Sequence, residues 1–266
     1  MKDVTIAFCV GGKDQFYQAL EKSLNSIRDN IKTECKIVVF DADNKMESAD
    51  EYTVIQMPVE KDNIHGYQYQ RYRIAEHIDT EWCIYADTDI IFYQDRINYY
   101  LDEAEDFTLT QHFWVPKVFN YLQHHPIPQS IIDYLFRGAT ENNYYASGIF
   151  AFKPKEHSDI LDKVRERFEK IHLGNLPGNQ YVTDECVLAS VLKDYDVNIV
   201  NGAWNHCALP NQMPLVYKEE KLFGSNPFDS DLDPVFCFHA DTTRRRPHEG
   251  FSDENIKRIL KESFYL

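Results

Sequence analysis

Two carboxylates interrupt an apolar run in the stretch WCIYADTDIIFY, which covers residues 82–93. Asp87 and Asp89 flank Thr88, and hydrophobic residues lie on both sides of this triplet. A buried carboxylate without a partner takes up a proton or costs several kcal/mol, so the pair must reach water, a cation or a hydrogen-bond donor. We expect a strand to end here and the two carboxylates to bind a hard divalent cation, since such ions prefer oxygen ligands. A solvated acidic turn is the alternative for an isolated Asp-x-Asp pair.

A histidine and three arginines follow a second apolar run near the end of the chain. The run PVFCFHA predicts a late strand that ends at His239, and Arg244 to Arg246 come soon after. Mn²⁺ accepts mixed nitrogen and oxygen ligands, so His239 is a candidate third ligand beside the two aspartates. A basic cluster in an acidic chain favours an anion as its partner. The alternatives are a histidine hydrogen-bonded at the edge of the core and a solvated basic turn.

The first ninety residues alternate between strand and helix patterns. This alternation is typical of a doubly wound, mostly parallel sheet, in which ligands bind beyond the carboxyl ends of the strands. The Gly11-Gly12 turn, the acidic pair Asp41 and Asp43, and the Asp-x-Asp pair all fall at such ends, so we expect them to converge. Period-2 and helical spacing of apolar residues predict strands over 4–10, 36–43, 52–58 and 82–87 and helices over 13–30 and 68–78.

The second half begins with an irregular, aromatic stretch after Asp95 and then becomes regular again. The run SGIFAFKP predicts a strand ended by Pro154, and a charged helix follows to about His172. Thr183 is expected to cap a helix over 184–195, and Ser252 to cap the last helix. The inner face of that last helix is predicted to consist of Ile256, Ile259, Leu260 and Phe264.

Bulk composition favours one α/β domain and excludes several classes of protein. The 266 residues carry a formal charge of −15, which argues against general binding of nucleic acids or anionic membranes. No linker, repeat or apolar run of membrane-spanning length divides the chain. Six cysteines without CxxC spacing indicate reduced thiols and a cytoplasmic location. A secreted chain that has lost its leader is the alternative.

Four pieces of the sequence together resemble a known family. QRYRIAEHIDTEWCIYADTDIIF, ASGIFAF, TDECVLASVL and FHADTTRRRP occur in the same order as motifs of the nucleotide-sugar glycosyltransferases of the GT-A fold. The resemblance is to the family-eight type, which includes glycogenin and lipopolysaccharide galactosyltransferases. It implies one GT-A domain over 1–266, with a Rossmann-like, doubly wound mixed sheet. The implied parts are a nucleotide-binding half (1–94), an acceptor-binding half with a closing segment (95–251) and a C-terminal helix (252–266).

The sequence departs from the family pattern at several positions. Ala146 stands where the family has asparagine before Ser-Gly, and Glu185 stands where it has glutamine after aspartate. Thr242 replaces a glycine of the histidine motif, and Arg246-Pro247 replaces Lys-Pro. An arginine can still bind a diphosphate, often through two hydrogen bonds.

The resemblance implies a specific activity and a set of site residues. The activity is transfer of a sugar, with retention, from a nucleoside-diphosphate donor, expected to be UDP-linked, to a hydroxyl of a carbohydrate acceptor. Mn²⁺ or Mg²⁺ would be held by Asp87, Asp89 and His239, with Asp184 and Glu185 as catalytic residues. The implied donor-binding residues are Val10, Gly11, Gly12, Arg71, Asp87, Thr88, Asp89, Arg245 and Arg246. The aromatic candidates for stacking on acceptor sugars, with core packing as the alternative, are Trp114, Tyr121, Tyr144, Tyr145 and Trp204.

Three other functions remain open from the sequence. An inverting transferase of similar fold would use Asp184 or Glu185 as general base on the acceptor hydroxyl. A non-catalytic carbohydrate-binding protein would keep the Asp-x-Asp pair as a vestige. A nucleotidyltransferase is less favoured, because the Gly11-Gly12 turn lacks the basic residues that surround a triphosphate. We also expect the segment 240–250 to order over bound donor and metal.

Overall fold

A mixed seven-stranded sheet organises the chain, in the order β3-β2-β1-β4-β7-β6-β8. The computed structural model describes residues 2–59, 66–104, 106–112, 145–172, 184–209, 213–227, 229–240 and 250–265. Strands β1, β2, β3 and β4 run parallel, whereas β7 is antiparallel to both β4 and β6, and β8 is parallel to β6. The strands are β1 (Val4–Val10), β2 (Lys36–Asp41), β3 (Thr53–Gln56), β4 (Trp82–Ala86), β6 (Phe107–Gln111), β7 (Tyr145–Phe152) and β8 (Val197–Val200). The predicted doubly wound mixed sheet is therefore confirmed.

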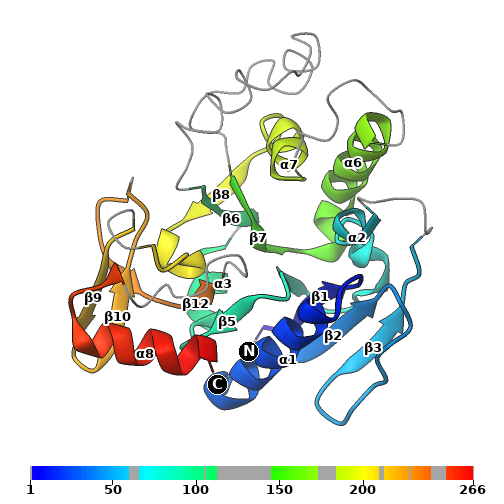
Figure 1. Cartoon of the computed structure of the whole chain (residues 1–266). Helices are drawn as coiled ribbons and strands as arrows, with labels where there is room; N and C mark the ends of the chain where they lie inside the picture. The colour runs from blue at the N-terminus through cyan, green and yellow to red at the C-terminus, as the bar shows by residue number, and fades with distance from the viewer. Residues whose placement is uncertain are drawn as a thin grey trace.

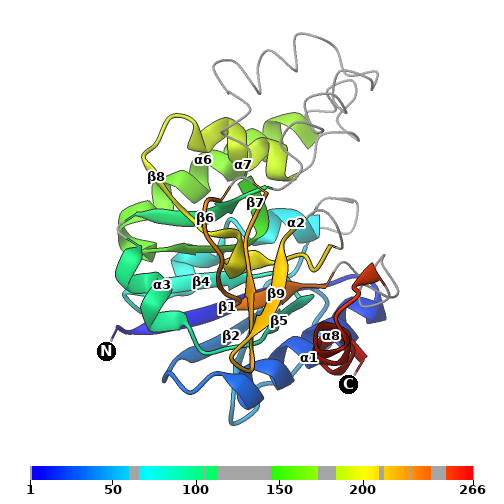
Figure 2. The same ribbon diagram turned by 90° about the vertical axis from the view of Figure 1, so that its left-hand side faces the viewer.

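Side chains alternate along the strands and therefore belong to two hydrophobic cores, one on each face of the sheet. On β1, Ile6 and Phe8 enter one core while Ala7 enters the other, as the period of a strand requires. Helices α6 (Pro154–His172) and α7 (Asp184–Leu192) pack with the Ala7 side, and α1 (Asp14–Asn30) packs with the Ile6 side. Both views show α6 and α7 on one side and α1 on the other (Figures 1 and 2).

The smaller elements include two further sheets and a third hydrophobic cluster. A three-stranded antiparallel sheet, β9 (Leu215–Lys218), β10 (Lys221–Gly224) and β11 (Asp233–Pro234), lies beside α8 (Glu254–Tyr265) in Figure 1. Strand β12 (Cys237–His239) pairs antiparallel with β5 (Ile90–Phe92). The remaining elements are α2 (Gly66–Gln70), η1 (Ile74–His77), α3 (Ile97–Glu103) and η4 (Gly202–Asn205). No helix among the described residues is both long and apolar enough to cross a membrane.

Two local predictions were wrong. The helix predicted over 68–78 is broken, because the amides of Tyr72 and Arg73 bond three residues back, to Tyr69 and Gln70, and so form tight turns between α2 and η1. The cap of α8 is Asp253 and not Ser252. The Asp253 carboxylate accepts hydrogen bonds from the amides of Asn255 and Ile256 at 2.8 and 3.3 Å.

The apolar face predicted for the last helix is correct over its described side chains. Ile256, Ile259 and Leu260 are buried, and the side chain of Phe264 lies outside the described residues. Thr183, the predicted cap of the helix that begins at Asp184, also lies outside the described residues.

Candidate active site

Asp87, Asp89 and His239 meet at one edge of the sheet. Strand β4 ends at Ala86, and the chain turns through Asp87 to Asp89 before β5 begins at Ile90. Pairing of β5 with β12 places His239 opposite Ile90, so the imidazole Nε2 lies 3.3 Å from Asp89 Oδ1. One ligand atom from each of these residues lies within 4.8 Å of the other two.

Strand β7 holds this cluster from the other side. The amide of Asp87 donates to the carbonyl of Gly148 at 2.7 Å, and the amide of Ala240 donates to the carbonyl of Asp89 at 2.8 Å. A Cβ on Gly148 would lie only 2.4 Å from Cε1 of His239. The imidazole therefore rests directly against the backbone of β7, and only glycine leaves space for it.

The three residues suit a divalent cation. Ligand atoms around one ion lie up to roughly 4 to 5 Å apart, which matches the observed grouping. Burial opposes a charge on His239, but the Asp89 carboxylate and the Cys207 thiol raise its pKa well above the usual value. Burial raises the pKa of Asp87, and the positive charge of Arg71 opposes this rise. A metal ion bound at these residues would displace the proton of His239, because an imidazole ligates a metal in its neutral form.

Arg71 connects this cluster to the first turn of α7. Its guanidinium lies 3.2 Å from Asp87 Oδ1 and 3.1 Å from Asp184 Oδ2. The hydroxyl of Ser147 donates to Asp184 at 2.8 Å, and the phenol of Tyr85 donates to Asp87 at 2.6 Å. Arg71 is 8% exposed, so it is a buried cation and not a surface charge.

The other acid of that turn faces a histidine that the sequence patterns do not single out. Glu185 Oε1 lies 3.5 Å from His112 Nε2, just beyond the end of β6. Burial and the nearby charge of His239 lower the pKa of His112 to about 4. The imidazole is therefore neutral at physiological pH. His112 lies here because β6 pairs with β7, a contact that the secondary-structure propensities of the sequence do not reveal.

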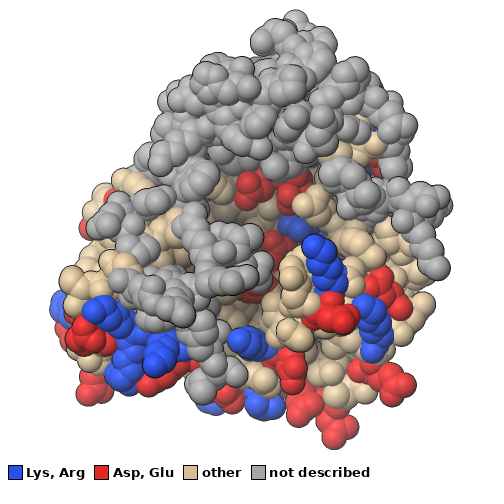
Figure 3. Space-filling view, viewed as in Figure 1, with Lys and Arg blue, Asp and Glu red and all other residues tan. Residues whose placement is uncertain are grey.

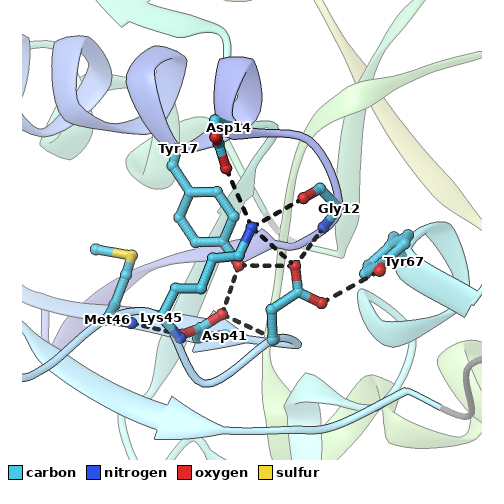
Figure 4. A network of polar contacts seen from close by, with 8 residues as sticks. Gly12, Asp14, Tyr17, Asp41, Lys45, Met46 and Tyr67 are labelled. Atoms are coloured by element: carbon cyan, nitrogen blue, oxygen red, sulfur yellow. Dashed lines mark hydrogen bonds and ion pairs between the residues drawn. The ribbon is translucent and has the colours of Figure 1, made fainter.

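The predicted glycine turn forms a second polar cluster with the end of β2 (Figure 4). The amide of Gly12 donates to Asp43 at 2.8 Å, and φ of Gly12 is 85°, a conformation that favours glycine. Asp41 is fully buried and accepts the amides of Lys45 and Met46. Asp41 therefore shapes the turn after β2.

The remaining predicted site residues fall into three groups. Val10 and Thr88 are buried beside the two clusters. Tyr145 and Trp204 are 2% and 1% exposed, which makes them core residues and not platforms for an acceptor sugar. Those that lie outside the described residues are Trp114, Tyr121, Tyr144, Arg245 and Arg246, together with most of the predicted closing segment.

Acidic side chains outnumber guanidinium groups among the described residues of the site. These carboxylates are Asp87, Asp89, Asp184 and Glu185, and the guanidinium of Arg71 contacts Asp87 and Asp184. Acidic side chains also gather in the hollow at the centre of the face shown in Figure 3. An anionic ligand can enter such a site only together with a cation.

Comparison with solved structures relates this arrangement to sugar-transferring enzymes. No model of a known protein family matches the sequence, and no curated protein sequence matches it. The galactosyltransferase LgtC, solved with donor and acceptor sugar analogues, matches with a TM-score of 0.60 at 15% identity, over 99% of this chain and 96% of LgtC.

Two further glycosyltransferases share part of the architecture. The bifunctional WbbM matches with a TM-score of 0.55 at 12% identity, over 79% of this chain and 40% of WbbM. GlyE of Streptococcus pneumoniae TIGR4 matches with a TM-score of 0.50 at 14% identity, over 78% of this chain and 48% of GlyE. The chain therefore has the GT-A glycosyltransferase fold, in an arrangement that resembles LgtC along almost its whole length.

Proposed function

We propose that this protein is a metal-dependent glycosyltransferase. It would transfer a sugar from a nucleoside-diphosphate donor, expected to be UDP-linked, to a hydroxyl of a carbohydrate acceptor. The observation that carries this proposal is the grouping of Asp87, Asp89 and His239 at the strand ends of a glycosyltransferase fold. The similar enzyme LgtC was solved in complex with donor and acceptor sugar analogues, which supports the substrate class.

The charges of the site support the metal requirement. Within the described part of the chain, a diphosphate would face four carboxylates and the guanidinium of Arg71. Mn²⁺ or Mg²⁺ would be held by Asp87, Asp89 and His239, and when bound it supplies positive charge to the leaving diphosphate. Mn²⁺ suits the histidine better, because Mg²⁺ prefers oxygen ligands.

Arg71 and Asp184 form a rigid support for the transferred sugar. The carboxylate of Asp184 accepts bonds from Arg71 and Ser147, and both Asp184 and Arg71 are 8% exposed. These two partners hold the carboxylate in place, so Asp184 serves as a fixed hydrogen-bond acceptor for a sugar hydroxyl. A group held this way loses little side-chain entropy when substrate binds.

Retention at the anomeric carbon is proposed from the resemblance to family-eight enzymes. The inverting alternative would use Asp184 or Glu185 as general base, and Asp184 contacts Arg71 and Ser147. Glu185 faces the neutral imidazole of His112 at 3.5 Å. Either residue would act as the general base on the acceptor hydroxyl if inversion occurs.

The test is a panel of nucleotide sugars incubated with Mn²⁺ and scored for release of free nucleoside diphosphate. We expect slow hydrolysis of one UDP-sugar, loss of hydrolysis in Asp89→Ala, and normal hydrolysis in Asp102→Ala, an exposed aspartate of α3. Proton NMR of the released sugar then gives the stereochemistry. Binding of carbohydrate with no donor hydrolysis and no donor binding would instead support the non-catalytic alternative.

Two broader proposals accompany the activity. The chain is proposed to be one GT-A domain with the boundaries predicted from the sequence. All six cysteines are free thiols, which supports the proposal of a reducing, cytoplasmic location.

A further inference from the structure

A groove of about 670 Å³ lies between α1 and the strands β2 and β3. The α1 residues that line it recur three or four positions apart, and therefore share one face of the helix. The opposite wall is formed by Ile37 on β2 and by Met46, Glu51 and Tyr52 between β2 and β3. None of the residues of the metal cluster lines this groove.

The groove is long and narrow. Its lining on α1 extends from Asp14 to Arg28, which corresponds to about 21 Å along a helix. A volume of about 670 Å³ over that length gives a mean cross-section of about 30 Å². An α-helix with its side chains is about 10 to 12 Å wide and needs roughly 80 to 110 Å². The groove therefore fits one extended chain and is too narrow for a helix.

The floor of the groove is apolar. The half-buried side chains that pack against the core here and line the groove are Tyr17, Leu24, Ile37, Met46 and Tyr52. The protein covers these side chains only in part, so a ligand with methylene groups can cover the rest. A concave, mostly apolar site of this volume is typical of sites for small organic ligands.

The charges of the groove favour a cation. Glu21 on α1 and Glu51 before β3 are exposed, and neither pairs with a cation among the described residues. Lys45 and Arg28, which also line the groove, each pair with an aspartate, at 3.2 and 3.6 Å. The unbalanced charge among the described lining residues is therefore negative.

Lys45 shows how this groove receives an ammonium group. Its Nζ lies 4.7 Å from the centroid of the Tyr17 ring and 3.2 Å from Asp14 Oδ1 (Figure 4). An aromatic face beside a carboxylate is a favourable environment for an organic cation. The same combination of a ring and an acid recurs in the groove at Tyr52 and Glu51.

We propose that this groove binds a linear aliphatic polyamine in an extended conformation. Its ammonium groups pair with Glu21 and Glu51, and its methylene groups lie on Leu24, Ile37 and Tyr52. A compact metal ion would leave the apolar floor uncovered, and a neutral alkyl chain would leave the two acids unpaired. The site is separate from the one proposed for sugar transfer, and its test does not require that activity.

The experiment titrates the protein with spermidine and follows the methionine methyl groups by NMR, at roughly 0.15 M salt to screen distant charges. Met46 lines the groove, whereas Met57 and Met213 are each 3% exposed and do not line it. We expect the Met46 resonance to shift until the site is saturated, and the resonances of Met57 and Met213 to stay unchanged.

Substitution of the acids tests their pairing with the ligand. Glu21→Gln and Glu51→Gln should each weaken spermidine binding by about two- to fivefold, the range for an exposed ion pair, and the double variant by about tenfold. Glu81→Gln is the matched control, because Glu81 is an exposed glutamate directly before β4 that does not line the groove. The control makes the same change of charge and should bind spermidine as the wild type does.

Four outcomes would overturn the proposal. Equal weakening in all three single variants would indicate general attraction of a polycation to an acidic protein. An unshifted Met46 resonance at millimolar spermidine would place no ligand in the groove. Binding of 1,8-octanediol as tight as that of spermidine would exclude a role for the acids, because this diol has the chain without the charges. A Met46 resonance that shifts with protein concentration alone would indicate a second copy of the chain as the occupant.

Discussion

Gly148→Ala tests whether His239 binds the metal, without altering any proposed ligand. The added Cβ would lie 2.4 Å from Cε1 and 2.7 Å from Nδ1 of His239, whereas ordinary contacts begin at 3.4 Å. The imidazole is a rigid ring confined between β7 and Asp89, so it must move by about 1 Å. Gly148 does not have a positive φ, so the backbone itself accepts alanine.

A displacement of this size should weaken both the metal site and the fold. Loss of the correct orientation of a metal-binding histidine typically lowers metal affinity by about 10- to 100-fold. This range corresponds to about 1.4 to 2.8 kcal/mol. Overpacking in a close-packed interior costs about 1 to 3 kcal/mol in the free energy of unfolding. Titration with Mn²⁺, followed by the electron paramagnetic resonance signal of the free ion, measures the affinity directly.

Gly224→Ala is the matched control for this substitution. Its Cβ would lie 2.6 Å from Cδ2 of His206, a buried histidine that is not a proposed ligand. We expect Gly224→Ala to lose stability to a similar degree while binding Mn²⁺ as the wild type does. A folded Gly148→Ala protein with wild-type Mn²⁺ affinity would refute the assignment of His239 as a ligand.

Three further outcomes are expected. Arg71→Met should lower the free energy of unfolding by about 3 to 5 kcal/mol in urea titrations, because it leaves the carboxylates of Asp87 and Asp184 without their buried cation; a variant as stable as wild type would contradict this pairing. Removal of divalent metal with EDTA should abolish donor hydrolysis, which Mn²⁺ should restore in the wild type but not in Asp89→Ala. Burial lowers the pKa of His206 from 6.5 to about 4, so its stabilising effect is complete above pH 6.5 and is lost as the pH falls towards 4. By pH 5 this histidine should cost about 2 kcal/mol of unfolding free energy relative to pH 7.5, and the same comparison in His206→Gln should show a smaller loss.

The parts of the fold that the sequence predicted are those specified by local pattern. Strands β1, β2 and β4 appear where period-2 or continuous apolar runs end in glycine or aspartate. Asp87 and Asp89 could be singled out because carboxylates rarely lie between two buried runs. His239 was a candidate because it ends a predicted strand, and the β5–β12 pairing supplies the physical basis for its convergence with this pair.

The parts that were missed depend on contacts between residues distant in sequence. His112 follows β6 in a stretch predicted to be irregular, and only the pairing of β6 with β7 brings it to Glu185. Tyr67 precedes a predicted helix, and nothing in its neighbours indicates that its ring covers a turn some fifty-five residues earlier. The predicted helix through Arg71 failed because burial of Arg71 and Tyr72 between α2 and η1 favours tight turns over a continuous helix.

Two consecutive residues of β7 join the two halves of the candidate site. Side chains alternate along a strand, so Ser147 and Gly148 face opposite sides of the sheet. The hydroxyl of Ser147 reaches Asp184 on the side of α7, while the carbonyl of Gly148 receives the amide of Asp87 and its bare Cα leaves room for His239. A shift of β7 by one residue would exchange these positions, placing a side chain against the imidazole and removing the donor from Asp184. The antiparallel register of β7 against β4 therefore sets the geometry of the Asp87, Asp89 and His239 cluster and of the Asp184 carboxylate together.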